Sequence, residues 1–215
     1  MKTLIFENKD RLYFTSDLHF GHKNIIDICN RPFKDIEEMD EILIYNWNSI
    51  IKNSDTVFIL GDFCWKLNDK TIKHYISRLN GNKIFIKGNH DINEKPFPIL
   101  YDGFVNIKVR DEDNKTFNGY QYMTLCHYPM MSWYQSHRGS WQLHGHWHNL
   151  NITPEYMKKC EVEYNNIRNN LREEHLQMTA TRKYQYDVGV DGNHYRPVSY
   201  DYIKNLFNKN LEIKK

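Results

Sequence analysis

Residues 56–62 read TVFILGD, and residues 83–91 read KIFIKGNHD. Each stretch starts with β-branched, aromatic and other apolar residues, a composition typical of a buried strand, and stops at a glycine followed by polar residues. Between them, apolar residues at helical spacing run from Ile72 to Leu79, and Gly81 stands where a helix C-terminal cap is wanted. A strand, a helix and a second strand of these lengths predict a parallel crossover unit and therefore an α/β fold.

The same patterns extend upstream of this unit. Residues 4–7 and 11–15 are strand-like and flank a polar turn at residues 8–10, which predicts a β-hairpin. Asp35 and Glu38 have the spacing of a capping box and predict the start of a helix that runs to Ile50.

Downstream, the chain reads as further strands and a last helix. We expect strands at residues 104–110, 120–126, 141–144 and 186–190, the first two joined by a polar loop. Ser199 is the expected cap of the last helix, with Tyr202, Ile203 and Leu206 facing inward. Residues 149–183 interrupt this scheme, because Thr153, Pro154 and Glu155 signal a helix start and the sequence that follows is very polar.

Length and charge bound the class of protein. A chain of 215 residues that is 40% hydrophobic and 26% charged is globular, and we expect one domain over residues 1–215 with a helical insertion at about 150–183. There are 29 Lys and Arg against 27 Asp and Glu, a net charge of +2. This balance argues against a protein that holds nucleic acid by bulk positive charge.

Nothing in the sequence predicts a membrane span or a disulfide framework. No stretch approaches the roughly 20 apolar residues that a membrane helix needs, and the N-terminus turns polar too early for a secretory signal. The four cysteines are far apart and form no C-x-x-C pair, so we expect reduced thiols. These features favour a cytoplasmic protein.

Metal-binding residue types follow five of the predicted strands. Ligands of open α/β sheets gather beyond the carboxyl ends of the strands, so loops that follow different strands can converge on one point. Carboxylate, amide and imidazole donors suit Mn, Fe or Zn better than Ca. Two ions about 3.5–4 Å apart need roughly this many ligands, one of them a bridging carboxylate. The residues in question are Asp17, His19, Asp62, Asn89, His90, Asp91, His127, His146 and His148.

The ordered series of these motifs resembles the calcineurin-like metallophosphoesterase superfamily. The likeness covers most of residues 11–148 and resumes at residues 186–191, and every signature position is filled. The flanking stretches at residues 17–22, 31–33 and 196–198 are similar to a small branch of bacterial and phage members. The resemblance implies an α/β sandwich of two central mixed β-sheets flanked by helices, with the active site at the carboxyl ends of the strands.

The resemblance also implies roles for the residues. Asp17, His19 and His148 would hold one divalent ion, Asn89, His127 and His146 a second, and Asp62 would bridge them. A hydroxide between the ions would attack phosphorus. His90 would contact the phosphoryl group or protonate the leaving oxygen, and Asp91 would orient His90. The implied cofactor is a pair of divalent ions, with Mn the expected metal and Fe, Zn or Ni the alternatives.

Other residues have two interpretations each. His22 contacts the substrate phosphate or is a polar residue of a helical turn. Arg31 binds phosphate or forms a structural salt bridge. Arg138 touches substrate or is a solvated loop residue. His144 reads as a packed residue at a strand end, and the aromatic residues at 128–147 as a hydrophobic wall or a platform for a nucleobase.

The leading hypothesis is therefore a two-metal phosphoesterase acting on a phosphodiester of a nucleotide or nucleic acid. The alternatives are a phosphomonoesterase for a small molecule and a binding module that kept the fold without catalysis. The apolar stripe in the insertion, from Cys160 to Leu171, is a helix docked on the domain, a lid over the site or the contact of a homodimer.

Overall fold

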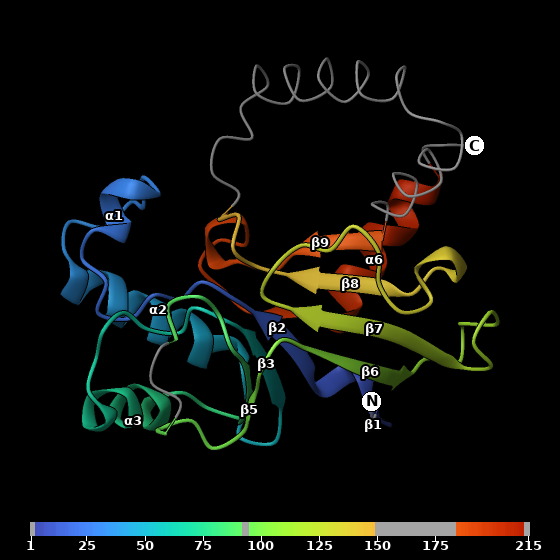
Figure 1. Cartoon of the computed structure of the whole chain (residues 1–215), viewed down its shortest axis with the longest axis horizontal. Coiled ribbons are helices and arrows are strands. Elements are labelled where there is room, and N and C mark those ends of the chain that lie inside the picture. The colour runs from blue at the N-terminus through green and yellow to red at the C-terminus, as the bar shows by residue number, and fades with distance from the viewer. Residues whose placement is uncertain (1–2, 92–94, 149–183, 213–215) are drawn as a thin grey trace, which may run out of the picture.

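The structure is a computed structural model, and it describes residues 3–91, 95–148 and 184–212. Its strands form two five-stranded sheets, and helices flank these sheets (Figure 1). This is the predicted α/β architecture of two mixed sheets. In the first sheet, called here the β3 sheet, the strands follow the order β10 (Val198–Ser199), β2 (Leu12–Thr15), β3 (Thr56–Leu60), β4 (Asn82–Ile86) and β5 (Leu100–Tyr101).

The second sheet, called here the β7 sheet, holds the strands of the second half of the chain together with β1. Its order is β1 (Leu4–Phe6), β6 (Phe104–Arg110), β7 (Tyr120–Cys126), β8 (Trp141–His144) and β9 (Gln185–Asp187). The β6 and β7 strands are antiparallel, whereas β7, β8 and β9 run parallel to one another. The carboxyl ends of β7 and β8 therefore lie side by side at the same end of this sheet.

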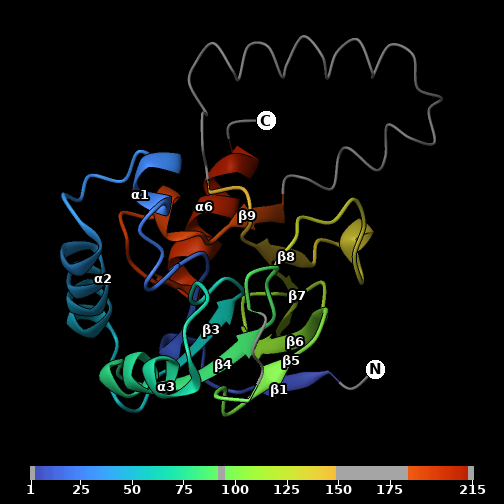
Figure 2. The same cartoon turned by 60° about the vertical axis from the view of Figure 1, so that its left-hand side comes forward.

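The described helices are few. They are α1 (Ile25–Ile28), α2 (Ile36–Ile50), α3 (Asp69–Arg78) and α6 (Tyr200–Glu212), with short 3-10 turns η1 (Lys9–Arg11), η2 (Ser136–Arg138) and η4 (Val190–Gly192). Figure 2 shows α2 and α3 on the outer side of the β3 sheet, away from the β7 sheet. No helix among the described residues has the length and apolarity to cross a membrane.

The β3 strand is buried on both faces, which explains its unbroken apolar sequence. Val57 and Ile59 lie in the core under the helices. Phe58 and Leu60 point the other way, into the core that the β7 sheet and α6 complete. The alternation follows from the two-residue repeat of a strand.

The crossover unit and the helix caps agree with the sequence predictions. The β3 and β4 strands are parallel and joined by α3, and Gly81 has a φ of 83°. Asp35 accepts a hydrogen bond from the Glu38 amide at 2.8 Å, and the Glu38 carboxylate accepts one from the Lys34 amide at 2.7 Å. The second bond goes to the residue before the cap, a small variation on the expected box.

The predicted N-terminal hairpin is wrong. The β1 strand pairs in parallel with β6 of the β7 sheet, and β2 pairs in parallel with β3 of the other sheet. The turn between them is η1, which carries the chain from one sheet to the other. Both strands bury apolar side chains in the shared core between the sheets, and a hairpin would leave that core without Leu4 and Phe6.

The inward face of the last helix also differs from its prediction. Ser199 accepts a hydrogen bond from the Tyr202 amide at 3.1 Å, as a cap does, but the Tyr202 side chain is 48% exposed. Over residues 200–208, the part of α6 whose burial is described, the buried residues are Tyr200, Ile203 and Phe207. Ile203 therefore faces the core as expected, whereas Tyr200 and Phe207 are buried where Tyr202 and Leu206 were expected. The predicted helical insertion at about 150–183 lies outside the described residues, and so do its lid and dimer alternatives.

Candidate metal centre

The predicted ligands lie on loops that follow strands of both sheets. Asp17, Asp62 and Asn89 follow β2, β3 and β4, whereas His127 and His146 follow β7 and β8. In Figure 1 the arrowheads of β7 and β8 lie near the middle of the picture and point toward α1 and α2, on the side where β2 and β3 adjoin the β7 sheet. The site is therefore a junction between sheets, and neither sheet could build it alone.

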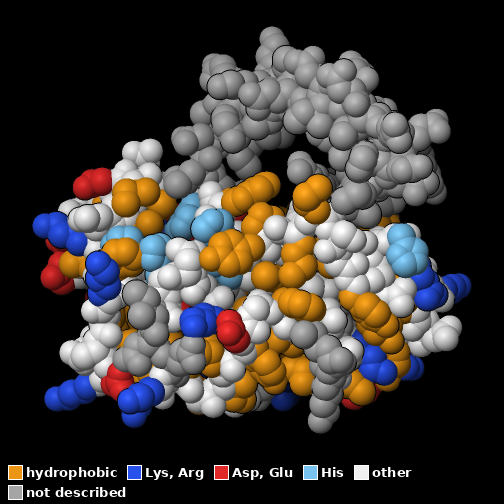
Figure 3. Space-filling model, viewed as in Figure 1, with side chains coloured by type: hydrophobic (Ala, Val, Ile, Leu, Met, Phe, Trp, Pro, Cys, Tyr) orange, Lys and Arg blue, Asp and Glu red, His pale blue; other side chains and the backbone are white. Residues whose placement is uncertain are grey.

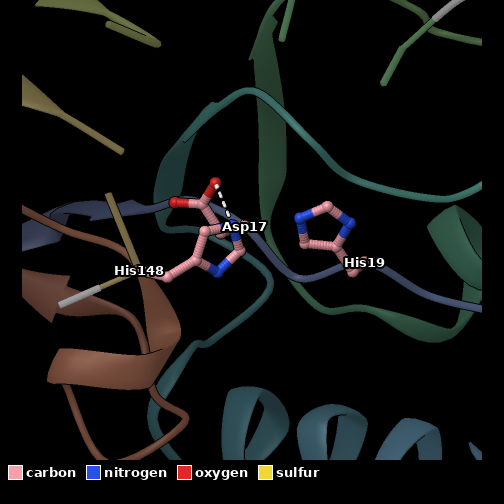
Figure 4. A group of neighbouring side chains, drawn as sticks. All are labelled: Asp17, His19 and His148. Atoms are coloured by element: carbon pink, nitrogen blue, oxygen red, sulfur yellow. Dashed lines mark ion pairs between the residues drawn. The ribbon is translucent and has the colours of Figure 1, made fainter. Parts of the chain in front are cut away.

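Three of these side chains form a first group. Asp17, His19 and His148 each offer a ligand atom, and these atoms all lie within 4.8 Å of one another. Nε2 of His148 lies 3.6 Å from Oδ1 of Asp17. The imidazole rings of His19 and His148 are stacked with their centroids 5.1 Å apart. Figure 4 shows Asp17 and His19 on the segment after β2 and His148 reaching them from a distant segment, with the ion pair of Asp17 and His148 dashed.

A second group forms beside the first. Asp62, His127 and His146 also have ligand atoms within 4.8 Å of one another. Asn89 belongs with them, because its Oδ1 lies 2.9 Å from Nε2 of His127. The structure thus brings together a carboxylate, an amide oxygen and two imidazoles here, the donor types that divalent transition metals take in proteins.

Asp62 lies between the two groups. Its Oδ2 is 3.4 Å from Nε2 of His127 in the second group and 3.6 Å from Nε2 of His19 in the first. Two donors that share one ion at about 2.1 Å each lie about 3–3.5 Å apart. The other carboxylate oxygen, Oδ1, accepts a hydrogen bond from the His90 amide at 2.8 Å, which fixes the orientation of the group.

The outer nitrogens of three histidines are occupied, and their inner nitrogens face the cluster. Nδ1 of His127 lies 2.8 Å from the Leu60 carbonyl, which only accepts, so Nδ1 carries the proton. Nδ1 of His148 and Nδ1 of His19 have their own partners, at 2.8 and 3.1 Å. Nε2 of His19 is fully buried and has no hydrogen-bond partner among the described residues. A buried, unpaired imidazole nitrogen aimed at a carboxylate fits a metal ligand.

Backbone strain concentrates at the predicted ligands. Five of them have a positive φ of 53–72°, a region that non-glycine residues rarely occupy. Such strain persists only where the surrounding structure holds it, and it gathers at functional sites. The five residues are Asp17, His19, Asp62, His146 and His148.

Two glycines allow the loops to approach one another this closely. Gly145 packs so tightly that a Cβ there would overlap the side chains of Ser16 and Asp17. Gly61 has a φ of 93°, and a Cβ there would overlap the ring of His127. Any larger residue at either position would separate the predicted ligands.

The electrostatics of the cluster favour a bound cation. Burial raises the pKa of Asp17 to about 7. Burial also raises the pKa of Asp62, but the hydrogen bond and charge of His127 outweigh it and hold the pKa at about 2. Burial lowers the pKa of His148, but the hydrogen bond to Asp191 and the nearby carboxylates raise it to about 10. Buried carboxylates that draw positive charge onto a histidine are the surroundings that a divalent ion neutralises.

His90 stands at the edge of the cluster. Its side chain is 30% exposed, and its Nε2 lies 3.9 Å from Oδ2 of Asp62. The ring thus faces both solvent and the second group, as a residue that touches substrate must.

The Asp91 carboxylate is directed at the backbone. It accepts hydrogen bonds from the amides of Asp62, Phe63 and Gly88 at 2.8–3.0 Å. These bonds hold the loop that carries Asp62 against the loop that carries His90. The expected orienting bond to the His90 ring is replaced by these backbone contacts, because Asp91 is buried beneath both loops.

His22 and Arg31 support the first group from behind. Nδ1 of His22 lies 3.1 Å from Nδ1 of His19, and its ring stacks on Trp65 with centroids 4.2 Å apart. The Arg31 side chain is fully buried and pairs with Asp191 at 2.7 Å. Of the two interpretations of Arg31, the salt bridge matches the structure, and the guanidinium does not reach the surface where a substrate would lie.

Arg138 lies away from the cluster, so of its two interpretations the structure favours the loop residue. The loop after β7 must return to the start of β8, because the two strands are parallel. Arg138, in η2 just before β8, is therefore at the opposite end of the β7 sheet from the cluster. Its guanidinium packs 5.2 Å from the Phe117 ring and donates to the Thr116 carbonyl at 3.3 Å.

The predicted aromatic group divides into two. Trp133 and Trp141 are buried, but they lie near the start of β8, at the end of the β7 sheet opposite the cluster, so they do not wall the metal loops. Tyr128 and Trp147 are 45% and 56% exposed, and the Tyr128 ring lies 4.7 Å from the ring of His146. Figure 3 shows hydrophobic side chains bordering the histidines on this face.

Three features of the site are absent from the sequence predictions. Asp191 contacts His148, Trp65 packs between His22 and His90, and Cys29 has its Sγ 3.5 Å from His148. Only Asp191 carried a signal, since it ends a motif at residues 186–191. Cys29, Cys64 and Cys126 are free and buried, in keeping with reduced thiols.

Comparison with known proteins agrees with this fold and site. The chain belongs to the calcineurin-like phosphoesterase family, whose model matches residues 10–192. It is accordingly a metal-dependent phosphoric ester hydrolase, and the binding module without catalysis is set aside.

Relatives come from an archaeon, a phage and a bacterium. The uncharacterized protein MJ1445 of Methanocaldococcus jannaschii is 33% identical over 93% of this chain and 92% of its own length. The gene 66 protein of Mycobacterium phage L5 is 29% identical over 70% of this chain and 83% of its own. A crystal structure of the protein of unknown function AQ665 from Aquifex aeolicus superposes with a TM-score of 0.61 at 25% identity, covering 91% of this chain and 98% of the other.

Proposed function

We propose that the protein hydrolyses phosphodiesters of nucleotides or nucleic acids with two divalent ions that share Asp62. The observation that carries the two-ion proposal is the position of Asp62, whose Oδ2 lies 3.6 Å from His19 and 3.4 Å from His127. Asp17, His19 and His148 would hold one ion, and Asn89, His127 and His146 the other. Mn is the proposed metal, since this mixture of oxygen and imidazole donors without thiolate suits it.

The bound ions supply a water of lowered pKa and offset the charge that builds on the phosphoryl oxygens. The protein supplies the rest. His90 presents Nε2 at the rim of the cluster, where it can hold a proton and give it to the leaving oxygen. Asp91 and the His90 amide keep the Asp62 carboxylate in one orientation, so that no reorganisation is needed during the reaction.

The nucleotide part of the proposal is supported by the exposed aromatic residues beside the cluster. Tyr128 packs edge-on against His127 and His146 and still exposes nearly half of its surface, and Trp147 is likewise exposed. An exposed aromatic ring stacks any nucleobase with a contribution of about 1–3 kcal/mol. Two such rings next to a phosphoryl site suit an ester that carries a base.

Turnover of bis(p-nitrophenyl) phosphate against p-nitrophenyl phosphate, with added Mn, tests the ester class. We expect the diester to be hydrolysed with the higher kcat/KM, and a set of cyclic and linear nucleotides then narrows the substrate. A strong preference for the monoester would overturn the diesterase proposal and leave the monoesterase. Tyr128→Ala should raise KM for nucleotide diesters much more than for bis(p-nitrophenyl) phosphate if the ring binds a base.

A further inference from the structure

Asp191 fixes the orientation of the His148 ring. Its Oδ2 accepts a hydrogen bond from Nδ1 of His148 at 2.8 Å. The opposite nitrogen, Nε2, is thereby turned toward Asp17, 3.6 Å from Oδ1. Asp191 belongs to η4 and is far along the chain from His148 and Arg31, the two residues that it contacts.

Arg31 in turn fixes Asp191 and the backbone at Asp17. Its Nε and Nη2 donate to the two oxygens of Asp191 at 2.7 and 2.8 Å, a bidentate pair. Nη2 also donates to the Asp17 carbonyl at 2.7 Å, and Nη1 donates to the Leu18 carbonyl at 3.1 Å. The side chains of Arg31 and Asp191 are 0% and 6% exposed.

We propose that Arg31 and Asp191 form a clamp that positions His148 and Asp17 for one of the two ions. The inference rests on the two-ion function proposed above. A planar guanidinium with several fixed donors can hold a carboxylate and a backbone segment at one geometry, which an ammonium cannot do. Partners behind metal ligands of this kind raise metal affinity by about 10–100-fold. Arg31 and Asp191 are positioning residues, since neither reaches the surface of the cluster.

A direct ligand role for Asp191 is disfavoured by the same contacts. Cys29, His148 and Asp191 also have ligand atoms within 4.8 Å of one another. However, both Asp191 oxygens already accept from Arg31, and the His148 nitrogen that faces them carries a proton. An ion there would have to displace the bidentate pair. We therefore expect Cys29→Ser to leave Mn binding unchanged.

The test measures Mn binding to the full-length protein. Metal analysis after equilibrium dialysis gives the number and affinity of the bound ions, and electron paramagnetic resonance reports whether two ions are coupled. Wild type should bind two ions. Asp191→Asn should bind one of them about 10–100-fold more weakly and the other as wild type does, with the signal of the coupled pair lost at limiting Mn. Glu41→Gln is the matched control, because Glu41 pairs bidentately with Arg78 at 2.6 Å on the exposed side of α2. It should bind both ions normally.

A double-mutant cycle separates positioning from a general structural effect. In a His148→Ala background, Asp191→Asn should change Mn affinity less than twofold, because Asp191 itself contacts only His148 of the two ligands and the bond to the Asp17 carbonyl comes from Arg31. Three results would each overturn the clamp. They are equally weakened binding of both Mn ions by Asp191→Asn, a loss of Mn affinity in the His148→Ala background as large as in wild type, and normal binding of both ions by Asp191→Asn. Weakened Mn binding by Cys29→Ser would replace the clamp with a direct site.

Arg31→Lys gives a second route if Asp191→Asn fails to fold. Lysine keeps the positive charge but cannot donate the two parallel hydrogen bonds to Asp191, so this variant should also bind one Mn ion more weakly and the other normally. Normal binding of both ions by Arg31→Lys would overturn the proposal. If wild type itself binds fewer than two Mn ions, the two-ion function fails. If wild type binds two ions and the clamp variants do as well, only the clamp fails.

Discussion

Oδ2 of Asp62 lies 3.4 Å from Nε2 of His127, although the two residues follow strands of different sheets. The distance exists only because the β3 sheet and the β7 sheet pack face to face through a shared apolar core. The chemistry of the cluster thus depends on the packing of the core, and changes that shift one sheet against the other will act on the cluster without touching it.

Replacement of the shared carboxylate should have the largest effect. In Asp62→Ala we expect kcat/KM to fall about a thousandfold or more, since the group proposed to hold both ions is lost. Metal analysis should find at most one ion in place of two. Asp27→Ala, an exposed change in α1, is the control and should behave as wild type. Two retained ions with normal turnover would refute the shared role.

His90→Ala should separate catalysis from metal binding. We expect two ions to remain and kcat to fall about 10²–10⁴-fold for an ester with a poor leaving group. For a nitrophenyl ester the loss should be smaller, because that leaving oxygen needs no proton. Steady-state kinetics on alkyl and aryl esters measure the difference. Identical losses for both would argue that His90 binds the phosphoryl group and does not protonate the leaving oxygen.

Arg138→Ala should have almost no effect on hydrolysis. The side chain packs on Phe117 at the end of the β7 sheet opposite the cluster. We expect kcat and KM within twofold of wild type for every substrate that the enzyme hydrolyses. A tenfold rise in KM would restore the substrate role that the structure argues against.

Metal binding should stabilise the fold. At a Mn concentration 100 times Kd, each site adds about 2.7 kcal/mol, and for a chain of this length this corresponds to a rise in Tm of about 5–10 °C. Thermal unfolding in EDTA and in Mn measures the effect. The rise should be much smaller in Asp62→Ala. An unchanged Tm up to millimolar Mn would count against a preformed site.

Asp40 gives a prediction for the pH dependence of stability. It is buried on α2, accepts from the Tyr75 hydroxyl at 2.6 Å and from the Gly21 amide at 3.2 Å, and burial raises its pKa to about 6. A raised pKa in the folded state means that the folded protein prefers the protonated group. The contribution to stability is complete below the unfolded pKa of about 4 and is lost as the pH rises through about 6.

Asp40→Asn removes this titration. Relative to wild type, the variant should gain about 2–3 kcal/mol in its free energy of unfolding between pH 4 and pH 7. Urea unfolding in EDTA at several pH values measures the difference, and Glu37→Gln is a control for an exposed carboxylate on the same helix. A difference that stays flat across this range would show that Asp40 is ionised throughout.

The sequence predicted strand ends well and long-range partners poorly. The motifs at residues 56–62 and 83–91 identify their strands because a buried strand needs apolar residues on both faces and the chain needs a glycine to turn. The N-terminal hairpin failed because local alternation does not encode which sheet a strand joins. Arg31 and Arg138 carry the same guanidinium group and could both bind a phosphate. Only their positions in the folded protein distinguish their roles.

What the sequence alone determined is which polar side chains follow the strands and in what order, since each polar motif must follow the strand that presents it. What the tertiary structure decided is how those side chains are held. The buried Arg31–Asp191 pair, the backbone role of Asp91 and the position of Asp62 between two groups depend on contacts between segments far apart in the chain. Distances of this kind follow from sheet packing and burial, which short-range sequence patterns do not specify.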